Sequence, residues 1–231
     1  MSTSAQSLGT VGIIGAGKVG TALARLAIDG GWSVTLSGSP RQPMQALIVE
    51  TLVPGARLLP EAEVVSGADL VIVAIPFGKA DSVDWAALTG KVVVDAMNYW
   101  YPVDGHVSAA DEFDGSTAEF THSRNPAMRL VKSLNHLGYH DMETDARPAG
   151  DPLRRSLVAA SDDVEARDLV AGFIDDIGFD PVVTSLADGT LLEPDGPVFG
   201  VELSREAMLR ALNEAGGEGT ATAARTELRV A

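Results

Sequence analysis

The N-terminal part of the chain alternates between short apolar runs and helical spacing of apolar residues. Residues 8–14 form an apolar run bounded by glycine, which predicts a buried strand. A stripe at helical spacing follows, made of Val19, Ala22, Leu23, Leu26 and Ala27. Gly30-Gly31 ends this helix, since glycine takes the left-handed position after a helix without steric cost. Residues 32–36 are the next expected strand, so the pattern predicts a βαβ unit.

The same alternation continues toward the C-terminus. Residues 69–75 and 91–95 are continuous apolar runs, typical of strands covered on both faces, and residues 130–134, 156–160 and 181–184 are further expected strands. A helix is expected over residues 162–177, with Asp162 and Glu165 at the spacing of a capping box, and a last helix over residues 204–213 with Ser204 as its cap. From residue 215 onward no periodicity remains, so we expect a mobile tail.

These elements predict the α/β fold class, with a doubly wound Rossmann-type parallel sheet and a smaller C-terminal α/β part. The expected division is a dinucleotide-binding domain over residues 8–125, an acceptor-side and dimerisation part over residues 126–214, and the tail over residues 215–231.

Charge and composition exclude several classes of partner. The chain has 17 Lys and Arg against 32 Asp and Glu, a net charge of −15, which repels nucleic acid and anionic membrane surfaces. It has no cysteine, which excludes disulfides, thiolate metal sites and cysteine nucleophiles. No spacing suggests a metal site, and no leader or membrane-spanning run is visible. We expect a cytoplasmic protein that acts on a small-molecule acceptor.

A glycine-rich turn lies between the first strand and the first helix. Gly15, Ala16, Gly17, Lys18, Val19 and Gly20 fit the pattern G-x-G-x-x-G in the strand–turn–helix context that a dinucleotide site requires. Gly15 permits the tight turn, Gly17 lets the backbone approach a pyrophosphate, and Gly20 lets the helix press against the strand. The helix N-terminus attracts the anion. The alternative is a structural turn in an α/β protein that binds no dinucleotide.

The end of the second strand indicates which dinucleotide binds. NAD sites usually carry a carboxylate there, but no acidic residue lies between Asp29 and Glu50. Ser37, Ser39 and Arg41 instead offer hydroxyls and a guanidinium, which suit a 2′-phosphate. We therefore favour NADP over NAD, the alternative being a solvated turn with an exposed arginine.

Several segments occur in the order of a known family. Besides the two turns, they are residues 71–77, 92–98, 131–135, 177–181 and 191–194. Together they resemble the NADPH:coenzyme F420 oxidoreductases, small Rossmann reductases, over most of residues 8–200.

The resemblance implies a homodimer that transfers a hydride between NADP(H) and the deazaflavin F420. By position it implies that residues 15–20 hold the pyrophosphate and that Ser37, Ser39 and Arg41 hold the 2′-phosphate. It also implies a lining for the groove from adenosine to nicotinamide, made of Ala74, Ile75, Pro76 and Phe77. Beneath the nicotinamide would lie Ala96, Met97 and Asn98.

The acceptor side departs from better-known members. Residues 98–102 are unusually aromatic, and their rings could stack on a flat acceptor or form a dimer interface. The anionic tail of F420 would need a local basic patch, which we place around Arg154 and Arg155. Asn135 and His136 are expected beside the acceptor.

Reduction of a carbonyl or imine would need a proton donor, whereas hydride transfer to a deazaflavin needs mainly positioning. The candidate acids are His136 and Tyr139, with Lys132, Tyr99, His122 and His140 also considered. His136 could equally be a neutral histidine satisfied by the backbone.

Three functions therefore remain open. The first is hydride transfer between NADP(H) and F420 or a related flavin-like acceptor. The second is reduction of a small carbonyl or imine metabolite, with His136 or Tyr139 as the acid. The third is regulation by a non-catalytic NADP(H)-binding protein. A cleft beside Met97, Asn98 and Asn135 would favour catalysis, and side chains filling that space would favour the regulator.

Overall fold

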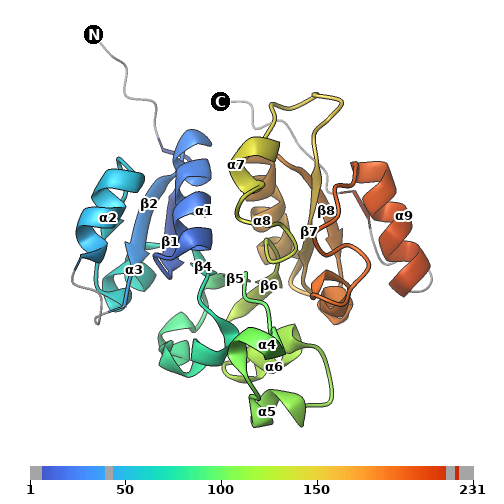
Figure 1. Cartoon of the computed structure of the whole chain (residues 1–231), viewed down its shortest axis with the longest axis horizontal. Helices are drawn as coiled ribbons and strands as arrows, with labels where there is room; N and C mark the ends of the chain where they lie inside the picture. Colours follow the sequence, from blue (N-terminus) through green and yellow to red (C-terminus); the bar gives the residue numbers. More distant parts are fainter. Residues whose placement is uncertain (1–6, 40–43, 217–221, 224–231) are drawn as a thin grey trace.

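A single mixed sheet organises the chain in the computed structural model, which describes residues 7–39, 44–216 and 222–223. Within these residues the sheet has nine strands in the order β3-β2-β1-β4-β5-β6-β7-β8-β9 (Figure 1). The strands are β1 (Thr10–Ile14), β2 (Ser33–Ser37), β3 (Arg57–Leu58), β4 (Leu70–Val73), β5 (Val92–Asp95), β6 (Arg129–Lys132), β7 (Ser156–Ala160), β8 (Asp180–Thr184) and β9 (Thr222–Ala223).

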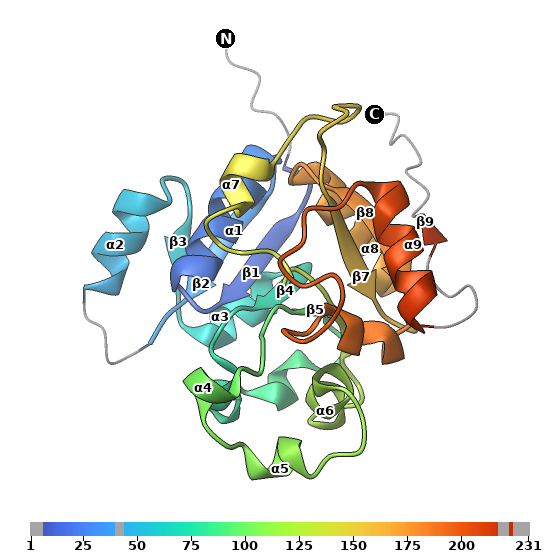
Figure 2. The same cartoon turned by 45° about the vertical axis from the view of Figure 1, so that its right-hand side comes forward.

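Helices connect the strands and cover the sheet. The α-helices are α1 (Lys18–Asp29), α2 (Gln45–Leu52), α3 (Glu61–Gly67), α4 (Tyr101–Asp104), α5 (Ser108–Asp111), α6 (Thr117–Ser123), α7 (Met142–Asp145), α8 (Val164–Asp176) and α9 (Arg205–Gly216). Short 3-10 helices are η1 (Phe77–Ser82), η2 (Trp85–Leu88) and η3 (Ala187–Leu192). In Figures 1 and 2, α4, α5 and α6 lie together below the sheet, beyond the ends of β4 and β5.

The strand order confirms the predicted doubly wound fold. Strands β3-β2-β1-β4-β5-β6 are parallel and follow the Rossmann order. The sheet then changes direction, because β7 pairs antiparallel with β6 where Lys132 meets Ala160. Strands β7 and β8 are again parallel, joined through α8. The expected boundary at residue 125 falls between α6 and β6, within this continuous sheet, and stays a prediction.

Alternate residues of each central strand enter different cores, because successive side chains point to opposite faces. On β5, Val94 belongs to the core beneath α1 and α8, and Val93 belongs to the core beneath α3, η1 and α6. A third cluster packs α9 against β7 and β8 through Val158, Val182 and Met208. The continuous apolar runs are thus strands buried on both faces.

Three local expectations need correction. The cap of α8 is Asp163, whose carboxylate accepts the Ala166 N–H at 3.0 Å, whereas Asp162 accepts the Leu186 N–H at 3.1 Å. The last helix extends to Gly216, although Ser204 does accept the Ala207 N–H at 3.4 Å as a cap. Residues 222–223 of the expected tail pair with β8 as a strand, and the rest of the tail from residue 217 lies outside the described residues.

Within the described ranges, no helix combines the length and the apolar character needed to cross a membrane.

Candidate active site

The glycine-rich turn joins β1 to α1 with one open face. Gly15 has a φ of +120°, and a Cβ there would lie 2.4 Å from the carbonyl oxygen of Ala74. A Cβ on Gly20 would lie 1.8 Å from the carbonyl oxygen of Gly15. Both glycines are therefore required by close backbone packing. A Cβ on Gly17 would meet no heavy atom within 4 Å. The turn is thus tight on the protein side and open at Gly17, where a ligand could approach.

The N-terminus of α1 suits an anion. Gly17 caps the helix without a side-chain hydrogen bond, and the first turn holds no acidic residue. The first amide groups of α1 and its dipole are therefore available to a phosphate. Lys18 adds a cation at this point, and its Nζ donates to the Tyr139 hydroxyl at 3.1 Å while lying 5.0 Å from the ring centre. These groups fit a pyrophosphate.

The end of β2 lies beside this turn. Ser37 is buried, and its carbonyl accepts the Gly15 N–H at 3.0 Å. Ser39 is exposed. Arg41, the predicted ligand of the 2′-phosphate, lies outside the described residues.

Gln45 at the start of α2 was not predicted to belong to the site. Its Nε2 donates to the Ala16 carbonyl at 3.2 Å, and its side chain covers Gly38 so closely that a Cβ there would lie 2.1 Å from Oε1. Oε1 is buried and has no hydrogen-bond partner in the described part of the chain. An orphaned polar atom beside the turn fits a place where a ligand supplies the partner. The signal in the sequence was one polar residue opening an apolar stretch.

The loop after β4 contributes only in part to the predicted groove. Ala74 and Ile75 are half-buried and Pro76 is exposed. The Phe77 ring is buried in the core beneath α3 and α6, with its centre 4.9 Å from that of Tyr99. The ring of Phe77 therefore supports the loops from below and does not lie on the surface.

A buried ion pair lies at the ends of β5 and β6. Lys132 Nζ is 3.3 Å from Asp95 Oδ2, and both side chains are fully buried. Asp95 Oδ1 accepts the Met97 N–H at 2.9 Å, and Lys132 Nζ donates to the Met97 carbonyl at 2.5 Å. The pair thus fixes the loop predicted to lie beneath the nicotinamide. The sequence offered a signal, since each charge directly follows an apolar run.

Asn98 and Asn135 come together next to that loop, as the prediction of adjacent sites requires. Asn98 Nδ2 donates to the Asn135 carbonyl at 2.7 Å, and Asn135 Nδ2 donates to Asn98 Oδ1 at 2.9 Å and to the Leu192 carbonyl at 2.7 Å. Leu134, just before, has a φ of +65°, a strained conformation for a branched side chain. Strain of this kind gathers at functional sites.

His136 is a buried, neutral histidine. Its Nε2 accepts the Val158 N–H at 3.1 Å. Burial lowers the pKa of His136 to about 3, with repulsion from Arg155 and Lys132 adding to the effect. Because Nε2 accepts, the one proton of this imidazole is on Nδ1, and burial prevents uptake of the second proton that would make the ring an acid at neutral pH. The geometry therefore favours the structural alternative over the acid.

The other candidate acids also have partners. The Tyr99 hydroxyl donates to Asp111 at 2.6 Å, which raises the pKa of Tyr99. The His122 Nε2 lies 3.2 Å from the Met128 carbonyl. The ring of His140 lies 3.9 Å from that of Tyr139, centre to centre.

The expected basic patch at Arg154 and Arg155 is wrong. Arg154 Nη1 lies 2.6 Å from Asp175 and 3.0 Å from Asp180, and Arg155 Nη1 lies 2.8 Å from Asp145. Both guanidinium groups are buried. Carboxylates from distant parts of the chain neutralise these arginines, so they cannot attract an anionic tail.

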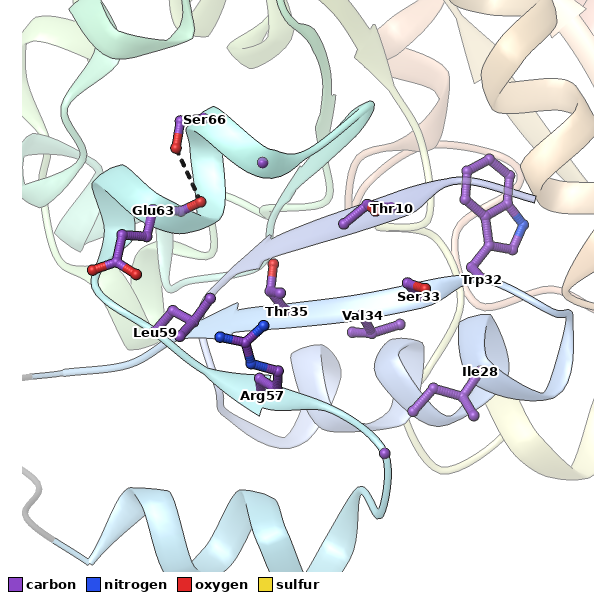
Figure 3. A pocket seen from close by; sticks show the side chains of 12 residues that line it. Thr10, Ile28, Trp32, Ser33, Val34, Thr35, Arg57, Leu59, Glu63 and Ser66 are labelled. Carbon is purple, nitrogen blue, oxygen red and sulfur yellow. Dashed lines mark hydrogen bonds between the residues drawn. The ribbon is translucent and has the colours of Figure 1, made fainter. Parts of the chain in front are cut away.

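A hollow of about 670 Å³ lies elsewhere, beside α3 and the beginnings of β1 and β2 (Figure 3). It is lined by Thr10, Ile28, Trp32, Ser33, Val34, Thr35, Gly55, Arg57, Leu59, Glu63, Ser66 and Gly67. Ligands of doubly wound sheets bind at the carboxyl ends of the strands, so this hollow is separate from the site. Across residues 7–39 and 44–216, His, Asp and Glu side chains form no cluster able to hold a metal ion.

Comparison with known proteins gives a family and several similar folds. Residues 10–99 match the family described as NADP oxidoreductase, coenzyme F420-dependent. A hypothetical protein of Sinorhizobium meliloti is 24% identical, with a TM-score of 0.71 over 86% of this chain and 96% of that one. A structure described as a putative F420-dependent NADP reductase of Arthrobacter sp. FB24 is 22% identical, with a TM-score of 0.66 over 85% of this chain and 100% of that one.

More distant folds belong to longer chains. A variant of an imine reductase from Myxococcus stipitatus, in complex with NAD⁺, is 16% identical, with a TM-score of 0.56 over 80% of this chain and 58% of that one. No curated protein matches the sequence. The resemblance predicted from the sequence is confirmed for residues 10–99, and the chain is an NADP-dependent oxidoreductase.

Proposed function

We propose that the protein transfers a hydride between NADP(H) and coenzyme F420 or a related flavin-like acceptor. The observation that carries this proposal is the state of the two predicted acids. His136 is buried and neutral, and the Tyr139 hydroxyl accepts a hydrogen bond from Lys18, which places it at the predicted pyrophosphate turn and away from the predicted nicotinamide loop. Carbonyl or imine reduction needs a proton donor beside the reduced atom, whereas transfer between two cofactor rings needs mainly position and exclusion of water.

Neighbouring groups of the protein would hold the cofactor in position for this transfer. The open turn at Gly17, the N-terminus of α1 and Lys18 would hold the pyrophosphate. Ser37, Ser39 and Arg41 would take the 2′-phosphate. When bound, NADPH supplies the hydride. The loop after β5, which Asp95 and Lys132 hold in place, would position the nicotinamide ring relative to the acceptor.

A direct assay separates the three functions. The protein is mixed with NADPH and oxidised F420, and the deazaflavin absorbance is followed. We expect bleaching that depends on both NADPH and protein. At the same NADPH concentration, bleaching should be much slower with a Gly17→Ala variant, in which the added methyl group weakens NADPH binding. NADPH consumed only with an imine or a carbonyl would support the small-substrate reductase. Tight NADPH binding without any turnover would support the regulator.

The choice of NADP over NAD has its own test. We expect NADPH to bind at least about tenfold more tightly than NADH, which corresponds to roughly 1.4 kcal/mol. Replacing Arg41 with alanine should remove that preference and leave NADH binding unchanged. Equal binding of both dinucleotides to the unaltered protein would contradict the assignment of the 2′-phosphate site.

We also propose a cytoplasmic homodimer. Trp100 and Tyr101 are 50% and 55% exposed, whereas Trp32 and Trp85 are buried, so tryptophan fluorescence from the surface comes mainly from Trp100. If Trp100 stacks on the acceptor, F420 should quench this emission at any protein concentration. If Trp100 lies in a dimer interface, diluting the protein until the dimer dissociates should shift the wavelength of the Trp100 emission. Light scattering should then show a fall in molecular mass over the same range of protein concentration.

A further inference from the structure

The peptide on either side of Met97 is held by two buried charges. Its N–H donates to Asp95 Oδ1 at 2.9 Å, and its carbonyl accepts from Lys132 Nζ at 2.5 Å. Replacing a buried ion pair by apolar residues of similar size is often neutral for stability. The geometry instead shows what the pair holds in place: Asp95 orients the peptide plane before Met97, and Lys132 orients the plane after it.

A trans peptide points its carbonyl and the following N–H in opposite directions. The described residues contain no cis peptide. Since the Met97 carbonyl points at Lys132, the Asn98 N–H must point away from Lys132. The Asn98 side chain is already bound to Asn135. The Asn98 N–H itself has no acceptor among the residues that the structure describes.

The backbone hydrogen bonds of β5 show which way this N–H points. Peptide groups of a strand lie in the plane of the sheet, and here the Ala96 N–H donates to the Val73 carbonyl of β4 at 3.1 Å, whereas the Asp95 carbonyl accepts from the residue that follows β6. The Met97 carbonyl also points toward β6, because it accepts from Lys132. The Asn98 N–H is therefore directed toward the carboxyl end of β4, which lies against the glycine-rich turn, since a Cβ on Gly15 would come 2.4 Å from the Ala74 carbonyl oxygen. This edge of the sheet is the side on which a dinucleotide would lie.

We propose that the Asn98 backbone N–H donates a hydrogen bond to the carboxamide oxygen of the nicotinamide, with Lys132 and Asp95 as the positioning residues. The carboxamide is the polar group of that ring, so one fixed donor sets which way the ring faces. This inference rests on NADP(H) as the bound cofactor, and not on the identity of the acceptor.

Binding of two probes separates the nicotinamide from the rest of the cofactor. The probes are NADPH and 2′-phospho-ADP-ribose, which lacks the nicotinamide, each titrated by calorimetry. The variant is the double change Lys132→Met with Asp95→Asn, which removes both charges together, so that no buried ion is left alone. The amide of residue 95 still accepts the Met97 N–H. We expect NADPH to bind about fivefold more weakly, the effect of one hydrogen bond, and 2′-phospho-ADP-ribose to bind as before.

Ser133→Ala is the matched control. Ser133 is equally buried and adjacent to Lys132, but its hydroxyl donates to the Val158 carbonyl at 2.6 Å, away from the loop. This variant should bind both probes normally. Loss of both probes to the same extent in the double variant, or of neither, would overturn the inference.

Amide hydrogen exchange gives a second measurement on the unaltered protein. NADP⁺ should slow exchange of the Asn98 N–H, and 2′-phospho-ADP-ribose should not. Unchanged exchange with NADP⁺ would refute the donor role even if the double variant failed to fold. Because neither measurement uses an acceptor, failure of the F420 assay would leave this inference standing, and its own failure would leave that assay unaffected.

Discussion

Alanine at Gly17 should separate cofactor binding from folding. Gly17 has φ −88° and ψ −164°, which any residue adopts, and a Cβ there would meet no heavy atom within 4 Å. The loss of stability should therefore stay below about 1 kcal/mol, the scale of a helix-cap substitution. The new methyl group would occupy the space in which backbone amides approach the pyrophosphate.

The expected loss of binding follows from the bonds displaced. A phosphate oxygen sits about 3 Å from a donating amide nitrogen, so an added methyl must push it out of range. Loss of two hydrogen bonds to a charged group, at about 1.5 kcal/mol each, weakens NADPH binding about a hundredfold. Calorimetric titration with NADPH measures this loss, and thermal unfolding checks the fold.

Gly20→Ala is the contrasting variant in the same turn. Its Cβ would lie 1.8 Å from the Gly15 carbonyl oxygen, which is backbone and cannot rotate away. Overpacking of this kind costs about 3 kcal/mol or more, so this variant should be poorly folded. A Gly17→Ala protein that folds and binds NADPH normally would show that the turn does not hold the pyrophosphate.

Four further changes test other parts of the site. Tyr139→Phe should leave kcat within about twofold, because the hydroxyl lies beside Lys18 at the pyrophosphate turn and not at the predicted nicotinamide loop; a kcat loss resembling that of a general acid would contradict this. Folding lowers the pKa of His136 from 6.5 to about 3, so the unfolded chain binds a proton more readily and stability should fall as the pH drops from 6.5 toward 3. The unfolding constant should rise by up to about tenfold per pH unit in this range. His136→Gln should make stability, measured by chemical denaturation, depend less on pH. Arg154→Ala should cost about 3 kcal/mol in urea unfolding, since two carboxylates lose their partner, whereas the exposed Arg210→Ala should cost under about 0.5 kcal/mol. A deazaflavin without the anionic tail should have a KM within about threefold of that of F420, because carboxylates already neutralise Arg154 and Arg155. A much larger difference in KM would show that another cation binds the tail.

The periodic elements could be predicted because their signal lies within a few residues. Residues 156–160 form β7 with the expected bounds, and α1 carries its buried stripe where the 3.6-residue spacing placed it. Helices α4, α5 and α7 have four residues each and no such period. Helix α4 is instead tied down by tertiary contacts, such as the Gly78 N–H that Asp104 accepts at 2.9 Å. Such elements depend on neighbours that local sequence does not specify.

The acceptor side was less predictable for the same reason. The sequence shows His136 at the end of a strand, but not that the Val158 N–H, on a strand that reverses direction, would reach its Nε2. The direction of β7 decides this, and it rests on a single residue pair with β6. A histidine in that place is an acid or a structural acceptor according to tertiary pairing alone.

The net charge of the chain predicts some binding properties and fails to predict others. A net charge of −15 argued against polyanions, and a local patch at Arg154 and Arg155 was the expected exception. In the folded chain, the carboxylates of Asp145, Asp175 and Asp180 neutralise that patch. The acid-free segment between Asp29 and Glu50 differs, because its lack of carboxylates is a property of the sequence itself. The 2′-phosphate of NADP can therefore be recognised by charge, whereas a proposed deazaflavin would have to be recognised by its ring, through stacking and the alignment set by the loop after β5.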